Sequence, residues 1–130
     1  MKHIVHSIDS DFVVLSPDKR ATVETADAGL YERLDTDYGG FSGHELIACH
    51  TFDGDWPTWE IHPHGDEIVI LLSGNTTLVL QQDGGEHGVQ LSTPGAYVIV
   101  PRNTWHTART SVTTRMLFIT PGEGTENRPV

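Results

Sequence analysis

The sequence is poor in basic residues and in cysteine, and it has no long apolar run. Its 130 residues include 8 Lys or Arg against 18 Asp or Glu, which gives a formal charge of -10. An acidic surface repels phosphate groups and anionic lipids, so we expect neither nucleic-acid nor membrane partners. Cys49 is the only cysteine, which excludes an internal disulfide and makes a reducing cytoplasm the simplest location.

A targeting or membrane-spanning segment is also not apparent in the sequence. Residues 1–12 contain no unbroken apolar core of the kind found in signal peptides, so we expect none here. No apolar stretch approaches the roughly 20 residues that cross a bilayer. A chain of this length is expected to fold as one domain with a sizeable buried core.

Most of the chain has the pattern of short strands separated by turns. From residue 44 onward, segments rich in Val, Ile, Leu and Thr alternate with segments rich in Gly, Pro, Asn and Asp, which is typical of an all-β sandwich or barrel. Residues 12–15 predict a further strand, and residues 27–35 predict the one short helix, with Asp27 as its N-cap. Residues 121–130 are polar and are expected to be loose.

Two of the predicted strands are apolar on both faces. Residues 68–72 and 97–100 carry large apolar side chains at successive positions, which point to opposite sides of a strand. A sheet with one face in water would alternate apolar and polar residues instead. Something must therefore cover the outer face, and the candidates are the N-terminal strand, the short helix and a second subunit. We expect a homodimer.

Polar residues with metal-ligand chemistry occur at regular spacing in the middle of the chain. Gly54 is followed after five residues by Glu60, after one more by His62, after four by Glu67 and after six by Gly74. Side chains alternate along a strand, so Glu60 and His62 face the same side. A turn follows His62, and Glu67 then opens the next strand and returns beside His62.

A second segment completes the pattern. Gly95 is followed after five residues by Pro101, after one by Asn103, after two by His106 and after three by Thr110. The turn around Pro101 would bring His106 to the first group from a distant strand. Together the segments supply two imidazoles and two carboxylates, enough to hold a divalent metal with open positions for a substrate.

In these two motifs the sequence resembles the cupin superfamily, and in particular its small, single-domain, RmlC-like members with a cupin type-2 domain. The usual motifs are G-x5-H-x-H-x3/4-E-x6-G and G-x5-P-x-G-x2-H-x3-N. This sequence departs from them with Glu60 at the first histidine, Asn103 at the second-motif glycine and Thr110 at the closing asparagine.

The resemblance implies an all-β fold, a double-stranded β-helix or jelly-roll barrel with a short N-terminal helix. The resemblance covers residues 44–120, which we expect to form the barrel. Residues 1–43 would then supply an N-terminal strand and a short helix that pack on the barrel, and residues 121–130 a polar C-terminal tail.

The resemblance also implies a metal held by Glu60, His62, Glu67 and His106. With a carboxylate in place of one imidazole, this set is harder and more anionic, which favours iron or manganese, with zinc and nickel as alternatives. His64 is a rival ligand, because His62 and His64 could form the paired histidines. That register leaves only two residues before Glu67 and places a ligand beyond Pro63, which interrupts the strand.

Other histidines and the reaction are less constrained by the sequence. His44 and His50 share a strand face that could look into the barrel, and packing or a satisfied hydrogen bond is the simpler interpretation of both. The superfold hosts many reactions, so fold does not fix activity. We expect a metal-dependent enzyme, of the oxygenase or isomerase type, acting on a small molecule inside the barrel. The alternative is a non-catalytic cupin that binds or senses a small ligand or metal. The sequence assigns no catalytic residue and no cofactor besides the metal.

Overall fold

The computed structural model describes residues 3–130 as eleven strands and one helix. The helix, α1, spans Leu30–Asp37. In chain order the strands are β1 (Asp11–Leu15), β2 (Ala21–Thr25), β3 (Glu45–Phe52), β4 (Thr58–Ile61), β5 (Glu67–Ser73), β6 (Thr76–Gln82), β7 (Gly85–Leu91), β8 (Tyr97–Val100), β9 (His106–Arg109), β10 (Thr114–Thr120) and β11 (Glu126–Pro129).

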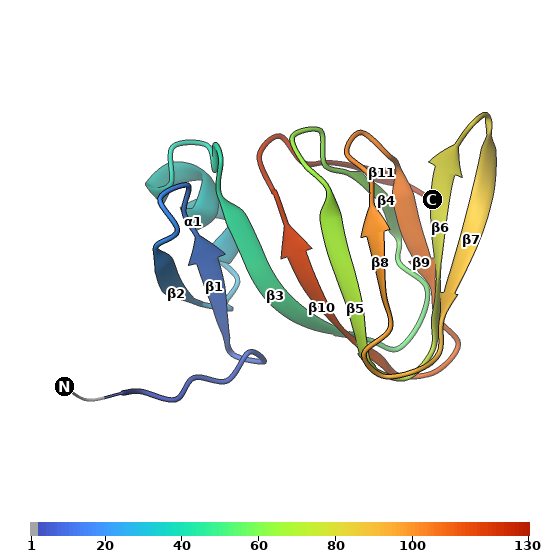
Figure 1. Cartoon of the computed structure of the whole chain (residues 1–130), viewed down its shortest axis with the longest axis horizontal. Helices are drawn as coiled ribbons and strands as arrows, with labels where there is room; N and C mark the ends of the chain where they lie inside the picture. The colour runs from blue at the N-terminus through green and yellow to red at the C-terminus, as the bar shows by residue number, and fades with distance from the viewer. Residues whose placement is uncertain (1–2) are drawn as a thin grey trace.

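Two antiparallel sheets face each other and enclose the core (Figure 1). One sheet has the strand order β2-β1-β3-β10-β5-β8, and the other has the order β11-β4-β9-β6-β7. Alternate residues of each strand point inward, as Val69 and Leu71 of β5 do, and both are fully buried. Burying each such side chain contributes about 1.5–3 kcal/mol. The all-β jelly-roll fold with one short helix is confirmed.

The N-terminal segment widens the first sheet instead of wrapping around the barrel. Strands β1 and β2 pair with each other, and β1 then pairs with β3. Helix α1 lies against these strands, and its Leu30 and Leu34 are buried in a second core cluster with Phe12, Val14 and Leu46. The side chain of Leu46 belongs to the inner face of β3, so α1 lies on the barrel side of the sheet.

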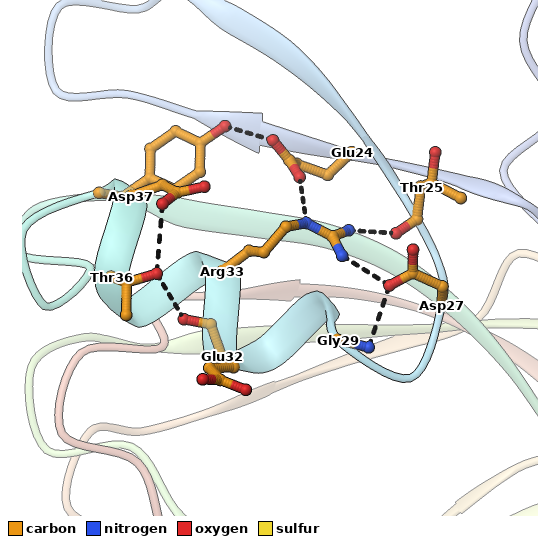
Figure 2. Close-up of polar contacts among 9 residues, drawn as sticks. Glu24, Thr25, Asp27, Gly29, Glu32, Arg33, Thr36 and Asp37 are labelled. Atoms are coloured by element: carbon orange, nitrogen blue, oxygen red, sulfur yellow. Dashed lines mark hydrogen bonds and ion pairs between the residues drawn. The ribbon is translucent and has the colours of Figure 1, made fainter.

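The helix begins later than the sequence predicts, and its first turn is built differently. Gly29 occupies the N-cap position, with no side-chain cap. Asp27 accepts a hydrogen bond from the Gly29 amide and contacts Arg33 at 2.7 Å, so its carboxylate closes the turn before the helix (Figure 2). Arg33 also reaches Glu24 at 3.3 Å and the carbonyl of Thr25 at 2.9 Å, which ties α1 to β2.

The C-terminal segment is a strand, so the prediction of a loose tail is wrong. Strand β11 pairs with β4 in antiparallel register, with Glu126 opposite Ile61 and Asn127 opposite Glu60. All four residues of β11 are exposed, because it is the edge strand of its sheet and its backbone supplies the contact. An exposed edge strand can have the same polar composition as an unstructured tail, so composition alone does not identify β11 as a strand.

The outer face of the six-stranded sheet carries a continuous apolar row. Residues paired across neighbouring strands share one face, and the row comprises Val23, Val13, Ile47, Ile119, Ile68 and Ile99. Ile99 is 52% exposed and Val23 is 42% exposed. Because α1 lies on the inner side, it does not cover this outer-face row. Within residues 3–130, no helix has the length and apolar character to cross a membrane.

Candidate metal centre

The ends of three strands, β4, β5 and β9, bring the predicted ligands together inside the barrel. Glu60 lies in β4 directly opposite His106 at the start of β9, and Glu67 opens β5. His62 follows the end of β4. His62, Glu67 and His106 are buried, while Glu60 is partly exposed. Ligand atoms of Glu60, His62 and His106 lie within 4.8 Å of one another, so these three residues could hold a metal ion.

Glu67 lies between the two imidazoles. Its carboxylate oxygens are 3.0 Å from Nε2 of His106 and 3.3 Å from Nε2 of His62. Among residues 3–130, neither Nε2 atom nor Oε1 of Glu67 has a hydrogen-bond partner of good geometry. Buried polar atoms are almost always paired, so three converging ones need a shared partner. A divalent cation fits this donor set.

The other ring nitrogen of each histidine is already used. Nδ1 of His106 donates to the carbonyl of Thr104 at 3.0 Å. Nδ1 of His62 contacts Oγ1 of Thr125 at 2.8 Å, and the Thr125 hydroxyl donates to the carbonyl of Gly122. Because the hydroxyl proton of Thr125 is donated to Gly122, Oγ1 of Thr125 can only accept, and it accepts from Nδ1–H of His62. Both Nε2 atoms therefore carry a lone pair in the neutral rings, as a metal ligand requires.

The charges of the centre depend on one another. Burial alone would raise the pKa of Glu67, but its interactions with His106 and His62 lower that pKa to about 2. Burial would lower the pKa of His106, and the neighbouring Glu67 raises it above the ordinary value instead. Burial and the charge of Glu67 raise the pKa of Glu60. The Thr120 hydroxyl donates to Glu67 at 2.6 Å and fixes that carboxylate. A cation would offset the repulsion between the two carboxylates.

The turn of the second motif is joined to the first motif by a backbone hydrogen bond. Asn103, at the usual glycine position, has φ of 58°, a left-handed conformation that asparagine tolerates better than most residues. The backbone N–H of Asn103 donates to the backbone carbonyl of His62 at 3.1 Å, which joins the two motifs next to the ligands. Gly74 cannot be replaced in this way, because a Cβ there would lie 2.4 Å from the carbonyl oxygen of Thr113. Thr110, at the usual asparagine position, contacts Thr76 at 2.9 Å.

The structure places His64 outside the cluster. It lies in the turn after His62, its side chain is 55% exposed, and its nearest carboxylate is Glu123 at 4.0 Å. The favoured alignment, with Glu60 and His62 as neighbours on one strand face, agrees with this placement. His64 therefore remains a surface residue next to the C-terminal segment.

A cavity of about 670 Å³ opens above the centre, and Glu60, His62 and Glu67 form part of its lining. His50 also borders this cavity, and its Nε2 contacts the hydroxyl of Tyr31 from α1 at 3.3 Å, in agreement with the packing or hydrogen-bonding role expected from sequence. Sequence reasoning missed Tyr31, Thr125 and Thr120. A threonine and a helical tyrosine carry no local signal for a site that forms only on folding.

We expect alanine substitution of Glu60 to lower the metal content, as it should for His62, Glu67 and His106. Alanine at His64 should leave the metal content unchanged, because that imidazole points to solvent. Elemental analysis of each variant, purified without an affinity tag, measures the effect. Loss of metal in His64→Ala together with full metal in Glu60→Ala would show that the ligand assignment is wrong.

Thr125→Val is expected to weaken metal affinity by roughly 10- to 100-fold, the usual effect of removing a partner that orients a ligating histidine. Valine keeps the shape of the side chain but cannot accept the proton of Nδ1 of His62. Thr93→Val, the same change in an exposed turn, is the control. Competition with a coloured chelator measures affinity, and equal values for the two variants would mean that the hydroxyl does not orient the ring.

Comparison with known proteins shows similarity of structure without similarity of sequence. No protein-family model matches the chain, and no curated protein does. The structure of Bacillus subtilis oxalate decarboxylase, which has Mn(II) centres, matches with a TM-score of 0.55 and 18% identity over 66% of this chain and 24% of that one. An oxalate oxidase matches with a TM-score of 0.53 and 16% identity over 62% of this chain and 44% of that one.

A cupin superfamily protein from Desulfitobacterium hafniense matches with a TM-score of 0.50 and 21% identity over 58% of this chain and 65% of that one. This chain thus spans less than two thirds of the length of these three proteins. Such identities show the fold and carry no activity with them. The chain has the fold of a cupin domain.

Proposed function

We propose that this chain is a metal-dependent enzyme of the oxygenase or isomerase type, acting on a small molecule inside the barrel. The observation that supports it is the convergence of unpartnered Nε2 atoms of His62 and His106 on buried Glu67, at the floor of a cavity of about 670 Å³. Small-molecule sites commonly have volumes of about 300–1,000 Å³. A bound divalent ion would polarise an oxygen atom of the substrate and stabilise negative charge there.

Glu60, His62, Glu67 and His106 would hold this ion. Two carboxylates and two neutral imidazoles balance the charge of a divalent cation. Oxygen donors favour iron or manganese over copper, with zinc and nickel as alternatives. The Mn(II) centres of the B. subtilis decarboxylase, which has a similar fold, support a hard divalent ion here.

The chain's own residues would prepare this site before any substrate arrives. Thr125 and the carbonyl of Thr104 hold the two imidazoles in the tautomer that presents Nε2 to the ion. Thr120 fixes the carboxylate of Glu67. Because three of the four ligands are buried, the cavity beside Glu60 is the side from which a substrate can reach the centre.

Open coordination positions distinguish an enzyme from the non-catalytic alternative. Protein purified without a tag is expected to retain about one metal ion per chain, and its Mn(II) form should relax water protons through at least about one exchangeable metal-bound water. Full metal content with no exchangeable water would indicate a closed site and favour a sensing or binding protein. A chain that retains no metal would refute the proposal.

We also propose that the chain is a cytoplasmic homodimer. The outer-face row, which includes Ile68, Ile99 and Val23, supports the dimer, because such a surface is costly to leave in water. A stable interface buries about 800 Å² on each partner, which a six-stranded sheet can supply. A single free cysteine, Cys49, supports a reducing compartment; burial raises the pKa of its thiol and keeps it unreactive.

Ile99→Lys is expected to convert the dimer to a monomer at roughly 20 µM, because it places a charge within an apolar interface. Val112→Lys is the control, since Val112 is 48% exposed in the segment between β9 and β10, away from the row. Sedimentation velocity measures the mass of each variant. A wild-type chain that sediments as a monomer at this concentration would contradict the proposed dimer.

A further inference from the structure

The cavity above the candidate metal centre has acidic side chains and no basic ones. Asp35, Glu60 and Glu67 border it, and among the residues that the structure describes no Lys or Arg does. An anionic ligand buried there would lose its hydration without gaining an ion pair. The cavity is therefore unsuited to a free carboxylate or phosphate beyond the reach of the metal.

One wall of this cavity is a continuous series of aromatic rings that starts at a predicted metal ligand. The ring of Trp56 lies 6.3 Å from that of His106, and it lies 5.2 Å from Phe52 and 5.8 Å from Phe118. Phe118 in turn lies 5.8 Å from His50. Aromatic groups favour stacked or edge-to-face partners at such separations.

Helix α1 supplies the side of the cavity that the barrel leaves open. Leu30 and Leu34, four residues apart, are buried against the N-terminal strands. Tyr31 and Asp35, on the adjacent helical face, border the cavity, and Leu34 also reaches its lining. Arg33 anchors the same helix to β2 through the contacts drawn in Figure 2. This anchoring of α1 places Tyr31, which is 60% exposed, at the rim of the cavity.

Tyr31 and His50 form a hydrogen-bonding pair in the lining of the same cavity. The Tyr31 hydroxyl lies 3.3 Å from Nε2 of His50. Burial, together with the charges of Glu60 and Glu67, raises the pKa of Tyr31, and burial lowers the pKa of His50. Both groups are thus uncharged at neutral pH, and the pair can offer a hydrogen bond to a ligand without offering a charge.

We propose, resting on the metal site proposed above, that the cavity binds an uncharged aromatic compound whose oxygen ligates the metal and whose far end contacts Tyr31 and His50. The aromatic wall receives the rings of the compound, and the metal receives its oxygen. A divalent ion balanced by Glu60 and Glu67 carries no net charge that would attract an anion. The Tyr31–His50 pair then selects compounds that have a second polar group.

Three probes that share one ring system and differ in charge test the first part. At pH 7, 2-naphthol is neutral, 2-naphthoate is an anion and 2-naphthylmethylamine is a cation. Calorimetry with the Mn(II)-loaded protein should show that 2-naphthol binds at least about tenfold more tightly than either of the others. Tighter binding of the naphthoate would mean that the metal centre attracts anions. Tighter binding of the amine would mean that the rings and carboxylates form a cation site. Either result would overturn the proposal.

A second hydroxyl tests the role of Tyr31. In the wild-type protein 2,6-dihydroxynaphthalene should bind about 5- to 10-fold more tightly than 2-naphthol, the usual effect of one added hydrogen bond. Tyr31→Phe should abolish this difference while leaving metal content unchanged. Tyr97→Phe is the control, because Tyr97 is exposed to a similar extent but lies on the outer side of β8, outside the lining of the cavity. If the difference is missing in the wild type, or persists in Tyr31→Phe, Tyr31 does not contact the ligand.

The two proposals fail in different ways. A protein that retains no metal but still binds 2-naphthol more tightly than 2-naphthoate would refute the metal centre and leave the aromatic cavity standing. A protein that holds metal with an exchangeable water but binds none of the three naphthyl probes would refute the aromatic ligand alone. Metal content is therefore measured on every sample used for calorimetry.

Discussion

The carboxylate of Glu67, buried between the imidazoles of His62 and His106, is the interaction on which the rest of the structure depends. A buried carboxylate costs several kcal/mol unless it is paired and hydrogen-bonded. Thr120 donates to it, and the two histidines lie 3.3 Å and 3.0 Å away. Those histidines are in turn held by a backbone carbonyl and by Thr125. Strands β4, β5 and β9 must therefore meet at these positions, together with the C-terminal segment.

The sequence predicts the part of this arrangement that follows from strand period and residue count. Alternation places Glu60 and His62 on one face, and the count from Gly54 selects this pair over His62 and His64. Local patterns do not reach Thr125, which lies 63 positions from His62, because a contact at that separation exists only after folding. Strand β11 is missed for a related reason: its exposed, polar residues give no local strand pattern, and its pairing with β4 exists only after folding.

The N-terminal segment illustrates how a local signal can be present and still misplace an element. Asp27 has the chemistry of an N-cap, yet its carboxylate binds the Gly29 amide and Arg33, and the helix begins at Leu30. The periodicity of Leu30 and Leu34 identifies the buried face correctly. It does not show that the neighbouring face borders a cavity, because that depends on where the barrel ends. Residues 1–43 thus complete the wall of a cavity whose candidate metal ligands all lie outside them.

The substitution that separates this sequence from the usual cupin motif links the metal to the ligand. Three imidazoles and one carboxylate around a divalent ion would leave one net positive charge, which favours an anionic substrate. Glu60 removes that charge and hardens the donor set at the same time. A centre without net charge gains little from an anion, so basic residues in the cavity wall would serve no purpose, and none borders it among residues 3–130. The aromatic rings around Trp56 are then the main source of affinity. In the proposed site, one carboxylate at position 60 would determine both the kind of ion and the polarity of the compound that the site can accept.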